Sequence, residues 1–245
     1  MEREKLDRKM TKEERKQKKR EQSVLREYFE LIAETAIFVF FVMTFVAQAS
    51  QVPTGSMENT MLIGDFLLVN KMAYADPVLP FEEKILPSKS VEHNDIVVFK
   101  SLEEPGKDLV KRVVGIPGDE IEIKDKQVYI NGDPVAESFK LHKDDRIFQE
   151  HEYYRYDDLI RDNFGPLEVP PGHYFVMGDN RDESYDSRYW GFLPFDYIKG
   201  RPWVIYFSYD AEENTHLHTS LRDRLGRLAQ YFPKARWGRI LHTIN

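Results

Sequence analysis

The sequence contains no cysteine, so disulfide bonds are excluded and cysteine usage gives no information about the cellular compartment. The seven histidines do not fall into a recognisable hydrolase motif. The only His-x-His pair, His216 and His218, lies in a polar stretch without a nearby carboxylate–histidine frame, which argues against a metal hydrolase. We therefore expect neither a metal nor another cofactor. Internal repeats are also missing.

Basic charge is concentrated at the N-terminus. Residues 1–30 carry eleven Lys or Arg and eight Asp or Glu, whereas the whole chain of 245 residues has a formal charge of −7. Five of these basic side chains are concentrated in "RKQKKR", Arg15 to Arg20. The acidic remainder offers no extended basic surface for a nucleic acid. We therefore expect no nucleic-acid partner.

One long apolar run follows the basic segment. Leu31–Ala49 is nineteen residues long and has a single charge, Glu34. At ~1.5 Å per residue a helix of this length just crosses a hydrocarbon core of roughly 30 Å. A buried core helix would show a polar face, and a cleavable signal peptide, for which "AQAS" (Ala47–Ser50) offers a cleavage site, would have a shorter apolar core. An uncleaved anchor is the favoured interpretation.

The anchor divides the chain into three predicted parts: a basic arm (1–30), a transmembrane helix (31–50) and an outer domain (51–245). Because positively charged segments stay on the cytoplasmic side of a membrane, we expect residues 1–30 in the cytoplasm and the rest, beyond a single pass, outside.

Strand patterns dominate the outer domain. Six segments are short, β-branched and bounded by turn residues: Asp65–Tyr74, Asp95–Lys100, Leu109–Ile116, Glu120–Val135, Gly172–Asp179 and Lys199–Asp210. The fourth of them alternates in period two and breaks at Asp125-Lys126 and Asn131-Gly132, which is typical of hairpins. The prediction is a mostly β, membrane-anchored domain built on an antiparallel sheet.

Two further segments of the outer domain show weaker patterns. An insertion is expected at about 124–171, of which 136–171 is rich in charge and tyrosine and is interpreted as a small cap. Leu221–Phe232 has apolar residues at helical spacing and predicts a short amphipathic helix.

Three segments place reactive side chains beside residues that allow unusual backbone conformations: Pro53–Met57, Leu109–Asp119 and Met177–Gly191. Each has an ordinary structural explanation: a linker serine, a lysine that reaches the edge of a strand, or a turn-rich loop with ion pairs. None of the three carries a functional conclusion alone.

Together these segments resemble the bacterial type I signal peptidases, which are membrane-bound Ser/Lys endopeptidases. The resemblance rests on "TGSMENT", "GDFLLVNK", "KRVVGIPGD" and "GDNRDESYDSRYWGF", in this order and at this spacing behind the anchor. It implies an enzyme that removes signal peptides from secreted preproteins by acyl-enzyme catalysis. It also implies a site in the bacterial cytoplasmic (inner) membrane and a monomer.

The resemblance makes Ser56 the nucleophile and Lys111 the general base. Ser–Lys pairs are a known variant of the catalytic triad. A lysine of ordinary pKa ~10.4 is neutral about once in 2,500 at pH 7, so deprotonating it costs roughly 4.6 kcal/mol of free energy. Burial lowers the pKa because desolvation penalises the charged form. Leu109, Val110, Val113 and Val114 would supply apolar surroundings.

Further roles carry over from the family. Thr54 stands where a hydroxyl helps to bind the oxyanion, and Ser184 matches the serine that orients the lysine. Asp186 and Arg188 match an ion pair that braces this loop.

The sequence departs from the family at two positions: Asn59 stands where proline is usual, and Glu183 where asparagine is usual. Neither replaces a reacting group, so the departures affect loop geometry and not the chemistry.

The substrate would bind extended, as an added strand, and would be cut after an Ala-x-Ala pattern. The residues that match the shallow apolar pockets of the family are Val52, Met57, Val98 and Val110.

Two alternatives stay open. A self-cleaving repressor shares the Ser/Lys chemistry but lacks an anchor, and a non-enzymatic tethered β-domain would bind a protein partner outside the cell and tolerate Ser56→Ala.

Overall fold

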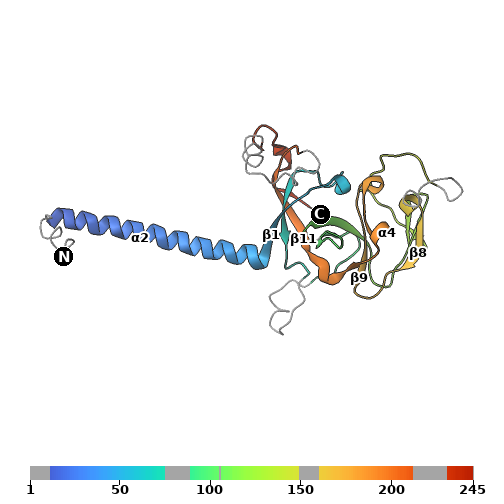
Figure 1. Cartoon of the computed structure of the whole chain (residues 1–245), viewed down its shortest axis with the longest axis horizontal. Helices are drawn as coiled ribbons and strands as arrows, with labels where there is room; N and C mark the ends of the chain where they lie inside the picture. The colour runs from blue at the N-terminus through green and yellow to red at the C-terminus, as the bar shows by residue number, and fades with distance from the viewer. Residues whose placement is uncertain (1–11, 75–88, 105, 149–159, 212–230, 245) are drawn as a thin grey trace. The chain divides into compact units, whose positions relative to one another are not determined.

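The computed structural model describes residues 12–74, 89–104, 106–148, 160–211 and 231–244, in two compact units, Met1–Val46 and Ala47–Asn245. The first unit is a helix, α2 (Lys12–Phe41), that continues into a π-helical turn, η1 (Val42–Val46) (Figure 1). Its segment Arg26–Val46 is long and apolar enough to cross a membrane. The apolar side chains along it are exposed, as expected of a helix that faces lipid.

The helix ends earlier than the sequence analysis predicts. Residues 47–50, assigned to the transmembrane helix, belong to strand β1 (Ala47–Gln51), which pairs antiparallel with β2 (Asp65–Asn70) from Ala47 opposite Asn70 to Gln51 opposite Phe66. The reason is that β2 offers a free edge, and the ladder satisfies the same backbone groups that a further helical turn would have satisfied.

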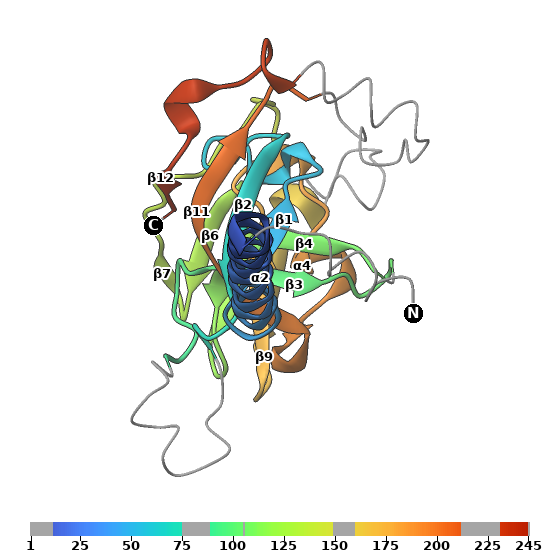
Figure 2. The same ribbon diagram turned by 90° about the vertical axis from the view of Figure 1, so that its left-hand side faces the viewer.

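Among the described residues, eight strands form the larger sheet, in the order β1-β2-β11-β3-β4-β9-β10 with β12 added to β11. The strands not yet placed are β3 (Ile96–Lys100), β4 (Asp108–Gly115), β9 (His173–Met177), β10 (Leu193–Pro194), β11 (Ile198–Ser208) and β12 (His242–Thr243). Figure 2 shows β11 running beside β2. The mostly β, antiparallel architecture predicted from the sequence is confirmed.

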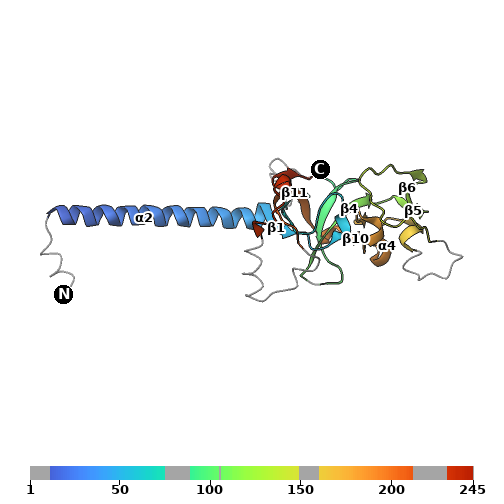
Figure 3. The same cartoon turned by 90° about the horizontal axis from the view of Figure 1, so that it is seen from above.

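Four strands form a second sheet, in the order β7-β6-β5-β8 within the described part of the chain. They are β5 (Glu120–Lys124), β6 (Gln127–Ile130), β7 (Asp133–Pro134) and β8 (Phe164–Glu168), and Figure 3 shows β5 and β6 side by side. Both turns have left-handed φ angles, 49° and 66° at Asp125-Lys126, and 53° and 85° at Asn131-Gly132. Two successive positive φ angles match the right-handed twist of a hairpin, as its sequence predicts.

The insertion is more than a cap. Its strand β8 completes the second sheet by pairing with β5, and Leu141 forms a bridge to Asn180 in the loop after β9. The sequence analysis missed β8 because Phe164–Glu168 contains Gly165 and Pro166, which are depleted in strands. Residues 221–230 of the predicted C-terminal helix lie outside the described residues.

Three apolar clusters form the core of the second unit. Strand β3 is buried on both faces, because Ile96 and Val98 belong to one cluster and Val97 and Phe99 to another. Successive side chains of a strand point to opposite faces, so the same alternation divides the neighbouring strand β4. This division decides the surroundings of Lys111.

Candidate active site

Ser56 lies in a single helical turn, η2 (Gly55–Met57), directly after the extended residue Thr54. The side chain is 7% exposed, and its Oγ lies 3.4 Å from the Thr54 Oγ1. The loop after β9 holds this turn, since Asn180 donates its backbone N–H to the Ser56 carbonyl at 3.1 Å and its side-chain amide to the Gly55 carbonyl at 3.2 Å. Asn180 therefore fixes the backbone of the turn that carries the hydroxyl.

Lys111 projects from β4 and is 2% exposed. Its Nζ lies 2.5 Å from the Ser56 Oγ, although the two residues are 55 positions apart in the chain. It stands opposite Val97 of β3 in the ladder and shares a face of the sheet with Leu109 and Val113. The position of Lys111 on β4 therefore places its amine beside the Ser56 hydroxyl, among mostly apolar side chains.

Burial lowers the pKa of Lys111 to about 8 because desolvation penalises the ammonium form. The carboxylate of Asp186 acts in the opposite direction, and the guanidinium of Arg188 partly cancels it. A lysine with a pKa of about 8 is neutral roughly one time in ten at pH 7, compared with about one time in 2,500 at an ordinary pKa of ~10.4. The site thus maintains a usable population of free amine.

The Asp186–Arg188 pair lies in α4 (Ser187–Trp190) and the residue that caps it. Arg188 donates from Nε to one Asp186 oxygen and from a terminal nitrogen to the other, each at 2.9 Å, and both residues are buried. Burial alone would raise the pKa of Asp186, but the Arg188 guanidinium holds it below its usual range. Arg188 also donates to the carbonyls of Arg161 and Arg181, so the pair ties the loop to the insertion.

Ser184 follows η4 (Arg181–Glu183) in the same loop. Its hydroxyl oxygen accepts the Gly178 N–H at 3.2 Å, and the hydroxyl donates to Asp186, which contributes to the lowered pKa of that carboxyl. Among the described residues the predicted contact from Ser184 to Lys111 is not formed, so this orienting role stays a prediction.

Gly178 is the position at which the loop and the nucleophile turn meet. A Cβ atom there would lie 2.3 Å from both the Ser184 Oγ and the Ser56 carbonyl oxygen. This contact excludes every other residue unless one of the two segments moves. The glycine of the "GDN" motif therefore serves close approach of the backbone.

A cavity of about 510 Å³ opens beside Ser56 and Lys111. Its apolar lining comes from Ile63, Phe99, Leu102, Leu109 and Trp190. The four residues predicted to line substrate pockets do not face this cavity: Val52, Met57, Val98 and Val110.

These four residues are 6% exposed or less and belong to a single core cluster. The physical reason is the alternation of the strand, because Val110 points to the face opposite that of its neighbour Lys111. The substrate-binding role of the four residues stays a prediction.

The sequence analysis missed several residues around the site. Arg112 forms a buried two-point ion pair with Asp179, at 2.8 Å on each side, and so joins β4 to the loop after β9. Asp179 belongs to the motif "GDNRDESYDSRYWGF", so the sequence did mark this position as part of the pattern of the family. Lys143, which also lines the cavity, belongs to the insertion and matched no motif.

Both departures from the family pattern have a structural explanation. Asn59 adopts a φ of 93° and donates its amide to the Phe139 carbonyl. Proline, with φ held near −65°, could not form this turn. Glu183 pairs with Lys143 at 2.7 Å. Each departure is therefore compensated by contacts with the insertion.

Comparison of the sequence with family models and with curated proteins identifies one family. The model of the family described as "Signal peptidase, peptidase S26" matches residues 25–207. The chain is 33% identical to signal peptidase I of Pseudomonas fluorescens and 31% identical to that of Pseudomonas aeruginosa, in each case over 82% of this chain and 79% of that protein. A crystal structure of a signal peptidase I from Enterococcus faecalis aligns with 33% identity and a TM-score of 0.36, over 46% of this chain and 97% of that chain.

The extent of the family match and the identity to the relatives leave the non-enzymatic alternative without support. The chain belongs to the signal peptidase I family: it is a serine-type membrane endopeptidase that removes signal peptides from preproteins.

Proposed function

We propose that Ser56 is the nucleophile and Lys111 the general base of signal-peptide cleavage. The observation that carries this proposal is the 2.5 Å separation of the Lys111 Nζ and the Ser56 Oγ in a site where both residues are buried. Burial supplies the neutral amine, and the contact gives it access to the hydroxyl proton.

The geometry supports a two-step reaction. The Ser56 Oγ attacks the carbonyl carbon before the scissile bond while Lys111 takes the hydroxyl proton. The C–N bond then breaks, the lysine ammonium protonates the leaving amine of the mature chain, and the signal peptide remains as an ester on Ser56. A water molecule, deprotonated by Lys111, hydrolyses the ester and restores the hydroxyl.

Trapping the ester tests this proposal. Full-length protein in detergent is mixed with a preprotein peptide that ends its signal region in Ala-x-Ala, quenched in acid and digested for mass spectrometry. We expect the mass of the signal fragment on the peptide that contains Ser56.

A substrate with tryptophan in place of the final alanine serves as control. We expect it to form no adduct, because the resemblance to the family implies a shallow pocket that accepts only a small side chain before the scissile bond. An adduct on a different residue contradicts the assignment of Ser56, and equal cleavage of both substrates contradicts the pocket.

Thr54 is proposed to help to bind the oxyanion, because its hydroxyl lies 3.4 Å from the Ser56 Oγ. Thr54→Val removes the hydroxyl with little change in shape and should lower kcat by about 10²–10³. Thr54→Ser keeps the hydroxyl and should retain most activity. Steady-state kinetics on the peptide substrate measures both, and an unchanged kcat in Thr54→Val rules the role out.

The family is anchored in membranes, and the segment Arg26–Val46 supplies a helix that could span one. We propose a single pass through the bacterial cytoplasmic membrane, with residues 1–30 in the cytoplasm and the β domain outside, because the basic residues precede the helix. Protease added to intact spheroplasts should digest the β domain, and its full protection contradicts this topology.

We propose that the monomer is active, because Ser56 and Lys111 of the same chain meet at 2.5 Å and the pair therefore does not need a second copy. Cross-linking in native membranes checks this: activity confined to a cross-linked dimer contradicts it.

A further inference from the structure

One wall of the catalytic cavity carries charged side chains that the reaction does not use. The Lys143 Nζ lies 2.7 Å from the Glu58 Oε2 and 2.7 Å from the Glu183 Oε2. The Asn180 amide donates to the same two carboxylates, at 3.4 Å and 3.1 Å. All three charged residues line the cavity together with Ser56 and Lys111. We call Glu58, Lys143 and Glu183 the charged wall.

The backbone places the charged wall beside the nucleophile. Glu58 follows Ser56 by two residues, and Glu183 directly precedes Ser184. Lys143 is held by the bridge between Leu141 and Asn180, in which the Leu141 N–H donates to the Asp179 carbonyl and the Arg181 N–H to the Leu141 carbonyl. These bonds fix the backbone two residues before Lys143 independently of its ion pairs.

The charged wall is open to a substrate. The side chains of Lys143, Glu58 and Glu183 are 39%, 40% and 58% exposed. Two carboxylates and one ammonium leave a net charge of −1. The other charged lining residues are Glu103, Glu104, Lys107 and Lys111. Even with Lys111 protonated they sum to zero, so they do not reverse the sign of the field.

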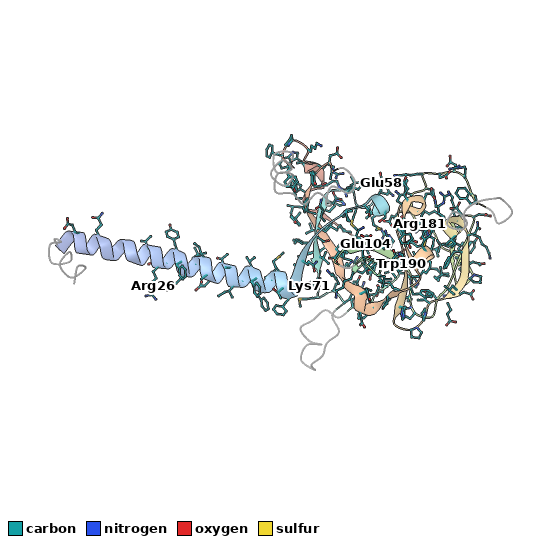
Figure 4. All side chains as sticks on the ribbon, in the orientation of Figure 1. Arg26, Glu58, Lys71, Glu104, Arg181 and Trp190 are labelled. Atoms are coloured by element: carbon teal, nitrogen blue, oxygen red, sulfur yellow. The ribbon has the colours of Figure 1, made fainter. Side chains whose placement is uncertain are left out.

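The cavity thus presents an apolar lining and a charged wall. In Figure 4, Glu58 lies above Trp190, which belongs to the apolar lining, and above Glu104. The substrate residues before the scissile bond are small and apolar, and they match the apolar lining. The residues after the bond begin the mature protein and are free to carry charge.

We propose that Glu58, Lys143 and Glu183 form a subsite that selects the charge of the first residues of the mature protein, favouring basic and disfavouring acidic side chains. This proposal rests on the proposed role of Ser56, because Ser56 defines where the scissile bond lies. Lys143 moderates the selection by neutralising one of the two carboxylates.

Matched peptides test the subsite. They share one signal region and carry Lys, Gln or Glu at the first or the second position after the scissile bond. For the full-length enzyme in detergent we expect kcat/KM for the Lys peptide to exceed that for the Glu peptide by about fivefold at one of these positions, the scale of an exposed ion pair. Raised salt should reduce this ratio.

Two variants should move the ratio in opposite directions. Lys143→Met leaves both carboxylates uncompensated and should raise the Lys-to-Glu ratio by about a further fivefold, whereas Glu183→Gln should bring it close to one. Lys143→Arg keeps the charge and should retain the original ratio. A merely structural role would change kcat/KM equally for all peptides and leave the ratio constant.

The control is an exposed ion pair of the second sheet, Glu122 with Lys124, at 2.6 Å and away from the cavity lining. Lys124→Met should not alter the ratio. An unchanged ratio in active Lys143→Met and Glu183→Gln enzymes overturns the subsite, as does discrimination confined to positions before the scissile bond. Cleavage by a Ser56→Ala enzyme would instead overturn the proposed function, so the two failures are distinguishable.

Discussion

Replacing Lys111 with methionine is expected to lower kcat/KM for signal-peptide cleavage by roughly 10⁴-fold or more. Methionine matches the aliphatic part of the side chain and removes the amine that contacts the Ser56 Oγ. Lys111→Arg should be similarly inactive because a guanidinium stays protonated. Ser56→Ala should cost as much, and the double variant should be little worse than either single one, because the two groups act as a unit.

The pH profile provides an independent measurement. The reaction needs the neutral amine, and burial lowers the pKa of Lys111 from 10.5 to about 8. The fraction of neutral amine therefore increases as pH rises, and kcat/KM should increase with it and level off above about pH 8.

The matched control for Lys111 is Lys100, an exposed lysine at the end of the neighbouring strand β3. Lys100→Met should keep its activity and the same profile. Near-normal turnover of Lys111→Arg, or a rate that is constant between pH 6 and pH 9, contradicts the Ser/Lys mechanism.

Replacing Arg181 with methionine is expected to lower the free energy of unfolding by about 3–5 kcal/mol. Arg181 and Glu137 form a two-point ion pair at 2.8 Å and 2.6 Å, with side chains that are 2% and 1% exposed. Loss of the arginine leaves the Glu137 carboxylate buried without a counter-charge. It also removes the Nε–H bond to the Gly178 carbonyl, beside the nucleophile turn.

A double variant separates the contribution of the two charges to stability from that of side-chain packing. Glu137→Met combined with Arg181→Met removes both charges and should recover most of the lost stability, because an apolar pair of similar volume does not carry the desolvation cost. Thermal or denaturant unfolding of the full-length protein in detergent measures all variants.

Arg146, whose side chain is 74% exposed and pairs with Asp144, is the control for Arg181. Arg146→Met should change stability by less than about 1 kcal/mol. Equal stability of Arg181→Met and Arg146→Met contradicts the structural importance of the buried pair.

Patterns within a few residues determined much of this protein. The apolar run predicts the helix, because backbone hydrogen bonding in lipid requires one. Short β-branched runs bounded by turn residues predict β3 and β4, and period-two alternation predicts β5 and β6. Residues that tolerate positive φ predict the two hairpin turns. Four motifs in order identify the family, and the comparisons confirm it. Each of these signals arises from neighbouring residues and is therefore readable along the chain.

Only the tertiary structure decided which side chains meet. Contact between β4 and the η2 turn brings Lys111 to Ser56, and the alternation along β4 turns Val110 into the core, away from the cavity. Lys143 reaches Glu58 through a bridge between the insertion and the loop after β9. The register of strands that are distant in sequence depends on the packing of the whole sheet, and no local pattern records it.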